Sequence, residues 1–276
     1  MIRRVLRRGA LAVLLLIVAA ALAGPWLPLP SPTGQTGMPY EPPGRGGLLG
    51  TDFLGRDALA RTAHGGRTLL LQALAATALG SLVGLAVGTL AGLSRRGPGT
   101  VLLRLVDGLA ALPPLLVMLL VAAGRPGSAT AVLVAVTAVS LPFSVRVIGG
   151  ATARLADLPY VRTALARGDG VLRVIRYDIL PNIAREAWAE AGIRFIAATQ
   201  LVATAGFLGL GAAAPAANWG RLVRENIPGA SDNPWPVVVP AALLAVLALG
   251  TTLAVDRLTA PGKPAVRPPQ RRSVAR

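Results

Sequence analysis

The chain has 276 residues, of which 53% are hydrophobic and only 14% are charged. Soluble domains carry about 25% charged residues, so this composition indicates a polytopic membrane protein. The net charge is +16, but aromatic residues are too few for base stacking, and nucleic-acid binding is not expected. Because the chain has no cysteine and a single histidine, His64, disulfides, thiol catalysis and Cys/His zinc sites are excluded.

Six apolar windows approach or exceed the length of about 20 residues that a helix needs to cross a bilayer core. They lie near Val5–Gly24, Thr68–Leu93, Val101–Ala123, Ser128–Val145, Ala187–Gly211 and Pro236–Val255. With a cytosolic start, twenty basic residues fall on inner segments and seven on outer ones, as the positive-inside rule requires. The sequence therefore predicts an all-α, multi-pass protein with six transmembrane helices and both termini in the cytosol.

The N-terminal segment, residues 1–24, allows two interpretations. Four arginines precede an apolar run that closes on Ala21-Leu22-Ala23, which is also typical of a cleavable secretory signal. A retained cytosolic arm and transmembrane anchor is favoured because a polytopic chain follows. Residues 25–66 are rich in proline and glycine and are predicted to form a periplasmic loop without an independent core.

The second window carries a regular glycine pattern. Gly80, Gly84, Gly88 and Gly92 recur every fourth residue, which places them on one helical face and allows close helix–helix approach. Two alternatives remain open from the sequence. The face packs inside the chain, or it packs against a second subunit.

A strongly basic insert, residues 146–185, separates the fourth and fifth windows and contains seven arginines. Pro159 suits the first turn of a helix, and Gly168 is expected to end it. A second helix with one apolar and one basic face is predicted over Val171–Ile179, and Pro181 is predicted to stop it before the next span. Such an insert fits either an anionic membrane surface or a soluble partner.

The fifth window contains charges at helical spacing, Glu186, Glu190 and Arg194. Charged groups are costly in hydrocarbon, so this face must meet protein or water. Glu190 and Arg194 either form a structural ion pair or belong to a substrate pathway. The tail, residues 259–276, is rich in proline and arginine and is predicted to be disordered and cytosolic, near anionic lipid headgroups.

Motifs of enzymatic chemistry are missing from the sequence. It contains no Gly-x-x-x-x-Gly-Lys-Ser/Thr, no Gly-x-Ser-x-Gly and no His-Glu-x-x-His. Gly209-Leu210-Gly211 begins like a dinucleotide fingerprint, but it follows a membrane span rather than a strand. The chain is therefore not expected to be an enzyme or to bind ATP through a P-loop.

The basic insert resembles the cytoplasmic loop of ABC-importer permeases, written Glu-Ala-Ala-x3-Gly-x9-Ile-x-Leu-Pro. The matching positions are Arg162, Thr163, Ala164, Gly168, Leu180 and Pro181. Three residues depart from the motif, since Arg162 replaces its Glu, Thr163 its first Ala and Asp178 its Ile. In this family the loop sits in a cleft on an ATPase subunit, so the charge reversal at Arg162 implies a compensating change in that partner or weaker coupling.

More specifically, the chain resembles the second-type permease subunit of dipeptide, oligopeptide and nickel importers. The motifs that carry this resemblance are Gly50-Thr51-Asp52-Phe53-Leu54-Gly55-Arg56-Asp57, Arg104-Leu105-Val106-Asp107, Ile179-Leu180-Pro181-Asn182, Phe207-Leu208-Gly209-Leu210-Gly211 and Trp219-Gly220. The resemblance implies a type I ABC-importer fold. Residues 67–258 would form a permease core of five transmembrane helices, with residues 146–185 as its coupling loop between spans 4 and 5.

The resemblance also implies partners and roles. In a bacterial inner membrane, the chain would pair with a second permease subunit, two cytosolic ATPases and an extracytoplasmic solute-binding protein. ATP and Mg²⁺ would bind the ATPases, and no cofactor is expected on this chain. The six motif residues of the insert would couple to the ATPase; Asp52, Arg56, Asp57 and Trp219 would contact the binding protein; Glu190 and Arg194 would line the pathway. Dipeptides or oligopeptides are the expected cargo, with nickel or another solute, or a membrane scaffold role, as alternatives.

Overall fold

The computed structural model describes residues 15–16, 18–44, 47–94, 98–212 and 216–259. Within them the elements are η1 (Gly24–Trp26), α2 (Ala58–Leu93), α3 (Pro98–Ala110), α4 (Pro114–Ala123), α5 (Ala129–Ala156), α6 (Pro159–Ala166), α7 (Val171–Val174), η2 (Ile175–Ile179), α8 (Leu180–Leu208), α9 (Trp219–Asn226), η3 (Ile227–Gly229) and α10 (Trp235–Thr259). No strand is found in these ranges, where β-pairing is limited to two isolated bridges, Gln35 with Arg56 and Thr51 with Asp57.

The long helices agree with the predicted membrane spans, although not all six are seen. Four described helices are long and apolar enough to cross a membrane, and a bent pair, α3 and α4, makes a fifth crossing if it is one span. The first predicted window, Val5–Gly24, lies largely outside the described residues, so a sixth crossing stays a prediction.

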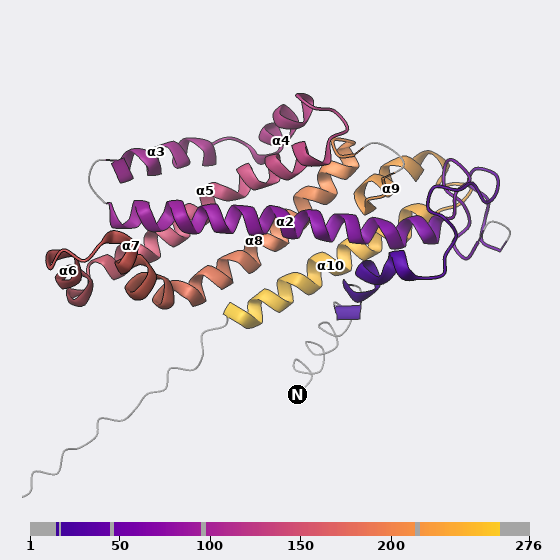
Figure 1. Ribbon diagram of the computed structural model, residues 1–276. Coiled ribbons are helices and arrows are strands. Elements are labelled where there is room, and N and C mark those ends of the chain that lie inside the picture. Colours follow the sequence, from indigo (N-terminus) through magenta and orange to yellow (C-terminus); the bar gives the residue numbers. More distant parts are fainter. Residues whose placement is uncertain (1–14, 17, 45–46, 95–97, 213–215, 260–276) are drawn as a thin grey trace, which may run out of the picture.

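The helices form an elongated bundle with short helices and loops at both ends (Figure 1). α2 packs against α5 and α8, and α10 packs against α8 and α9. At 1.5 Å per residue the 36 residues of α2 extend about 54 Å. α6 and α7 lie at one end of α2, and α9 with the loop that precedes α2 lies at the other (Figure 1).

The glycine face of α2 packs inside the chain, against α5. A Cβ atom on Gly84 would come within 2.5 Å of Ser144 Cβ, and one on Gly88 within 2.9 Å of Ile148 Cβ. One on Gly92 would lie 2.6 Å from the carbonyl oxygen of Gly149. Such distances leave no room for a side chain, so the small residues allow the two helix backbones to meet. Of the two alternatives from the sequence, the structure has the intramolecular one.

The third predicted span is not one continuous helix. α3 ends at Ala110, α4 begins at Pro114, and the two helices are bent by 87°. Pro113 and Pro114 explain the break, because proline lacks the N–H that continues a helix and disfavours helical geometry in the residue before it. The window Val101–Ala123 is apolar enough for a span, as predicted, but the prediction of one continuous helix there was wrong.

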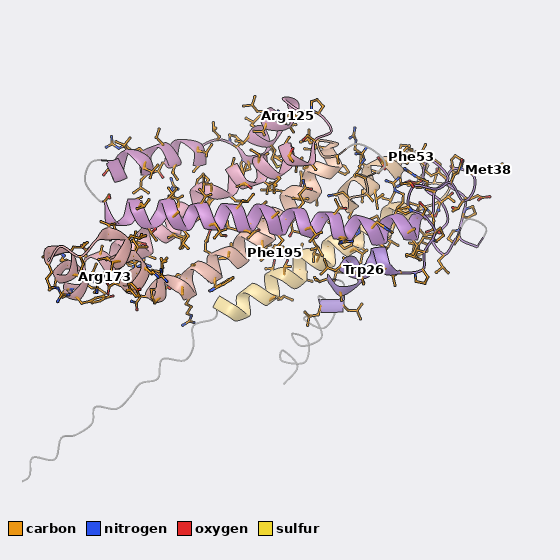
Figure 2. The ribbon with its side chains drawn as sticks, in the orientation of Figure 1. Trp26, Met38, Phe53, Arg125, Arg173 and Phe195 are labelled. Atoms are coloured by element: carbon orange, nitrogen blue, oxygen red, sulfur yellow. The ribbon has the colours of Figure 1, made fainter. Side chains whose placement is uncertain are left out.

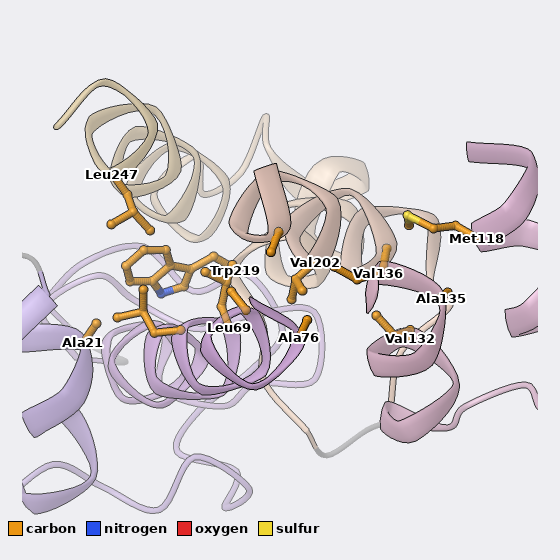
Figure 3. Close-up of a cluster of buried hydrophobic side chains, with 14 of the residues drawn as sticks. Ala21, Leu69, Ala76, Met118, Val132, Ala135, Val136, Val202, Trp219 and Leu247 are labelled. Atoms are coloured by element: carbon orange, nitrogen blue, oxygen red, sulfur yellow. The ribbon is translucent and has the colours of Figure 1, made fainter. Parts of the chain in front are cut away.

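The main core lies where α2, α5, α8, α9 and α10 meet. Figure 3 shows Leu69, Leu247 and Ala21 around the indole of Trp219, which is 1% exposed. The indole N–H donates to the backbone oxygen of Thr62 at 2.7 Å. Lipid tails are as apolar as leucine, so van der Waals packing, rather than escape from water, stabilises such a core in a membrane.

At the end of the bundle opposite α9, the basic insert is helical over most of its length. α5 continues to Ala156 and α8 already begins at Leu180, so both spans extend beyond their predicted windows into the insert. The structure has both predicted helices, α6 and α7, and between them Gly168 adopts a left-handed conformation with φ of +88°.

Pro181 does not stop the second helix. A π-helical turn, η2, joins α7 to α8, and Val171–Leu208 runs on as one apolar span. Pro181 follows this π turn directly, as the second residue of α8. The side-chain amide of Asn182 donates to the backbone oxygen of Asp178 at 2.7 Å, which satisfies a carbonyl at this turn. The prediction of a stop was wrong because the wider π turn accommodates the proline.

Candidate functional site

The α6–α7 loop, residues 157–179, is firmly attached to the bundle. Val161, Val174 and Ile179 are all 0% exposed and share a cluster with Ile148 of α5 and Ile183 of α8. Because the loop contributes fully buried side chains to this cluster, movement of the loop must be shared with α5 and α8. The loop is thus packed into the bundle and is not attached by its two ends alone.

The outward surface of the α6–α7 loop is basic and partly apolar. Arg162 pairs with Asp157 at 3.1 Å and Arg173 with Asp169 at 3.7 Å, but both arginine side chains are about 70% exposed. Such exposed pairs contribute about 0–1 kcal/mol. Leu172 is 78% exposed and Tyr160 45% exposed on the same loop. Exposed apolar groups among arginines are typical of a protein–protein interface.

The six motif residues divide between surface and core. Arg162, Thr163, Gly168 and Pro181 are exposed, Leu180 is half-buried, and Ala164 is 5% exposed in the cluster below. The Thr163 hydroxyl donates to the backbone oxygen of Pro159 at 2.8 Å, so its hydrogen-bonding need is met within its own helix. The exposed members are therefore available to a partner, while Ala164 fixes α6 to the bundle.

At the other end of the bundle, residues 27–57 and α9 together form what we call the α9 cap. Its centre is Asp52, whose Oδ2 accepts from Nε of Arg56 at 2.9 Å and from Nη1 of Arg61 at 2.7 Å. Arg61 also reaches Glu225 at 3.3 Å, and Glu225 pairs with Arg221 at 2.6 Å. The network joins the cap loop, α2 and α9. Asp52, Arg56 and Arg61 are only 1, 4 and 0% exposed.

The remaining predicted cap residues also act within the chain. The Asp57 side chain caps α2 by accepting from the backbone N–H of Ala60 at 2.6 Å. Trp219 lies in the main core. The four residues predicted to meet a binding protein, Asp52, Arg56, Asp57 and Trp219, are thus 1–5% exposed, and a direct contact does not fit their burial. Their polar groups hold the cap together instead.

Glu190 and Arg194 are brought together as an ion pair, at 2.8 Å between Oε1 and Nε. Ser144 of α5 donates to the same Glu190 oxygen at 3.2 Å, and the Arg194 guanidinium lies 5.0 Å from the centre of the Phe143 ring. Glu190 is 5% exposed, and its Oε1 contacts both Arg194 and Ser144. The ion pair that the structural alternative predicted is thus present within α8, and Ser144 connects it to α5. Of the two residues, only Arg194 also lines an open surface.

Sequence reasoning missed the residues that close the α9 cap. The pair of Arg61 and Glu225 spans 164 positions, and the Asn233 side chain donates to the backbone oxygens of Glu41 and Leu49 at 3.0 Å each. Sequence spacing can indicate only the i,i+4 pairs within each half of the cap, Asp52 with Arg56 in the loop and Arg221 with Glu225 in α9. No periodic signal connects the two halves of the cap.

Comparison with known proteins gives consistent matches. A peptide transport system permease protein of Brucella suis, described as putative, is 31% identical over 93% of this chain and 88% of its own length. A di/tripeptide transport system permease protein of Pseudomonas aeruginosa is 36% identical over 87% and 82%. Among solved structures, the MetNI methionine ABC transporter in an inward-facing conformation aligns with a TM-score of 0.56 at 20% identity, over 71% of this chain and 94% of that one.

The structural match supports the type I permease fold, which the four or five described crossings and the α6–α7 loop also fit. A family model matches residues 84–260, which include α5, the loop and α8. The chain belongs to the family of binding-protein-dependent transport system inner membrane components, and is a permease subunit rather than a catalytic one.

Proposed function

We propose that this chain is the permease subunit of an ATP-driven importer of dipeptides or oligopeptides. It would form the translocation pathway together with a second permease, work with two cytosolic ATPases and an extracytoplasmic solute-binding protein, and carry out no covalent chemistry. The observation that carries the proposal is the α6–α7 loop, which projects from one end of the bundle and shares a buried cluster with two membrane helices.

The α6–α7 loop has the properties of a mechanical lever. Its exposed side carries Arg162, Arg173 and Leu172, which suit an interface, and its inner side is locked to α5 and α8. Closure of the ATPases would therefore move both helices with the loop, and the bundle would alternate between inward- and outward-open states. This assignment puts the loop and both termini in the cytosol.

The positive charge of Arg162 predicts the charge of the ATPase surface that would face it. Its guanidinium is exposed, and its exposed pairing with Asp157 is weak enough to be exchanged for another carboxylate. The ATPase cleft would therefore present an acidic residue at this point, complementary to the arginine that replaces the Glu of the motif. Gly168, Thr163, Leu180 and Pro181 would shape the remaining contact.

The solute-binding protein would contact the outer surface of the α9 cap rather than its buried charges. Met38, Leu48 and Leu54 are 73, 79 and 47% exposed, and Figure 2 shows Met38 on the outermost part of the cap. Apolar side chains in a water-facing loop favour a protein partner. The network of Asp52, Arg56 and Arg61 would keep this surface in shape for docking.

Peptide cargo is favoured by the names of the relatives, each of which is a peptide transport permease. The test is uptake by cells that carry the complete transporter, with and without this chain. We expect loss of labelled dipeptide uptake on deletion and recovery when the chain is restored, with nickel uptake unchanged. Peptide uptake that persists without the chain would refute the proposal, and loss of nickel uptake alone would identify a metal importer.

Assembly is tested separately by affinity purification of the tagged chain from its native membrane. We expect a second permease and an ATPase to be recovered in stoichiometric amounts. ATP hydrolysis by the purified complex should rise when the solute-binding protein and a peptide are added together. A chain recovered alone, or hydrolysis indifferent to both additions, would favour the scaffold alternative.

A further inference from the structure

An open groove of about 330 Å³ lies near the middle of the bundle, between α5 and α8. Pro114, at the break between α3 and α4, borders it, and Ser140 and Phe143 of α5 form one side. Arg194, Gln200 and Thr204 of α8 form the other side. These three residues of α8 span about 15 Å along the helix axis.

The polar side chains of the groove are unsuited to contact with lipid. Gln200 is exposed, and its side chain makes no hydrogen bond within the described part of the chain. Thr204 uses its hydroxyl hydrogen on the backbone oxygen of Gln200, at 2.9 Å, and keeps its lone pairs free. By contrast, Leu120 of α4 and Leu249 of α10, which are 78 and 62% exposed, are apolar as lipid contact requires. In a membrane, Arg194 and Gln200 should therefore face water or protein, while Val139, Ala197 and Leu201 make much of the remaining lining apolar.

The charge of the groove is nearly balanced. Arg194 lines it, but its charge is already countered by Glu190, which lies buried behind it on the same helix. The groove thus offers one edge of a guanidinium, a carboxamide with donors and an acceptor, and a hydroxyl acceptor. This set matches the backbone of a short peptide, whose amides both donate and accept hydrogen bonds.

We propose that this groove is a cargo-contact surface of the permease, in which Gln200 and Thr204 determine specificity by hydrogen bonding the backbone of a short peptide. The inference rests on the proposed function of peptide import. The volume of the groove is at the lower end of ligand sites, which range over about 300–1,000 Å³. The groove therefore suits one or two peptide residues at a time. Glu190 is a positioning residue, because it fixes Arg194 without lining the groove.

The chain contains no cysteine, so a single introduced thiol reports on one site. The experiment uses the complete transporter in nanodiscs, with Gln200→Cys and, as the lipid-facing control, Leu249→Cys. A charged, water-soluble maleimide labels accessible thiols, and the label is read on the gel band of this subunit. We expect Gln200→Cys to react at least about tenfold faster than Leu249→Cys, and a dipeptide supplied with the binding protein to slow this reaction several-fold.

Two results would overturn the inference. Labelling of Gln200→Cys as slow as that of Leu249→Cys would mean that lipid or the second permease covers the groove. Fast labelling that the dipeptide leaves unchanged would mean a wet surface without cargo. Uptake by the unsubstituted transporter is measured first, so that failure of peptide import is distinguished from failure of the groove alone.

A second readout does not depend on the thiol. Gln200→Leu keeps the approximate size of the side chain and removes its hydrogen-bonding groups. We expect it to raise the KM for dipeptide uptake several-fold more than that for uptake of longer peptides, which have other contacts. An equal change for every peptide, or none, would contradict a role in specificity.

Discussion

The α9 cap and the α6–α7 loop stand at opposite ends of the same helices, and both are rich in arginine, but they use it in opposite ways. Arg56 of the cap and Arg61 of the adjoining first turn of α2 are 4 and 0% exposed and converge on Asp52. Arg162 and Arg173 in the loop have side chains that are 68 and 73% exposed, with carboxylate partners at 3.1 and 3.7 Å. One end uses arginine to hold its own chain, and the other presents arginine outward.

The physical consequence is a division of labour. Removing one partner from a buried ion network leaves an uncompensated charge and costs several kcal/mol, whereas exposed pairs contribute little. The cap should therefore tolerate few polar substitutions without loss of stability. Polar substitutions in the α6–α7 loop should leave folding largely unchanged and impair coupling to the ATPase.

The largest effect is expected in the cap. Asp52→Asn leaves Arg56 and Arg61 without their shared carboxylate, and should lower the free energy of unfolding by about 3–5 kcal/mol. Thermal denaturation in detergent measures this loss. The matched control is Asp169→Asn in the α6–α7 loop, whose pairs at 3.7 and 3.8 Å are exposed, with an expected change below about 1 kcal/mol. Equal losses would erase the contrast between the two ends.

The next largest effect is expected where the glycine face of α2 packs against α5, a contact that we call the seam. Gly84→Val forces a side chain against Ser144, and should cost about 1–3 kcal/mol of stability by pushing α2 and α5 apart. Gly108→Val provides the control, because a Cβ there meets nothing within 4 Å. Melting temperature and peptide uptake should both fall for Gly84→Val only. A Gly84→Val protein of normal stability would mean that the seam opens readily.

A smaller effect on folding is expected at Gly168. Its φ of +88° is unfavourable for any side chain, so Gly168→Val should cost about 1–2 kcal/mol, or displace α6 relative to α7. Membrane insertion should persist while uptake is lost. Gly170→Val is the matched control, since its φ is −61° and its surroundings are equally open. Normal uptake by Gly168→Val would refute the lever role of the loop.

The smallest change in stability, under about 1 kcal/mol, is expected for Arg162→Glu, because the side chain is 68% exposed. Recovery of the ATPase with the tagged permease should nevertheless fall several-fold, since the substitution reverses the charge at the proposed interface. Arg162→Lys, which keeps the charge, should retain most of it. Stronger ATPase recovery with Arg162→Glu would show that the partner cleft is basic.

Several features of the fold followed from local sequence alone. Apolar length and the distribution of arginine predicted the long helices, since a helix in lipid must satisfy its own backbone and needs a fixed number of apolar residues. Four of the predicted windows correspond to described helices. The two prolines, Pro113 and Pro114, could have predicted the break in the third window. The prediction instead followed the apolar composition of that window. Pro181 misled because the π turn before it is a rare element that the sequence reading did not consider.

The candidate sites were harder to predict than the fold. The residues Asp52, Arg56, Asp57 and Trp219 were predicted to meet a binding protein, but they are buried and contact their own chain. The α6–α7 loop was located by its motif, whereas the groove beside Arg194 was not, because Ser140, Gln200 and Thr204 come from two helices and share no pattern. A residue's exposure depends on what lies across from it, and one sequence does not contain that information.

The sequence by itself determined the class of protein, the positions of its long helices and the basic loop between two of them. These depend on hydrophobicity and helical periodicity, which act over a few turns of chain. The tertiary structure alone decided which arginines are buried, what the glycine face of α2 packs against and where the groove beside Arg194 opens. Each of these depends on contacts between residues far apart in the chain, such as Arg61 with Glu225 and Ser144 with Glu190.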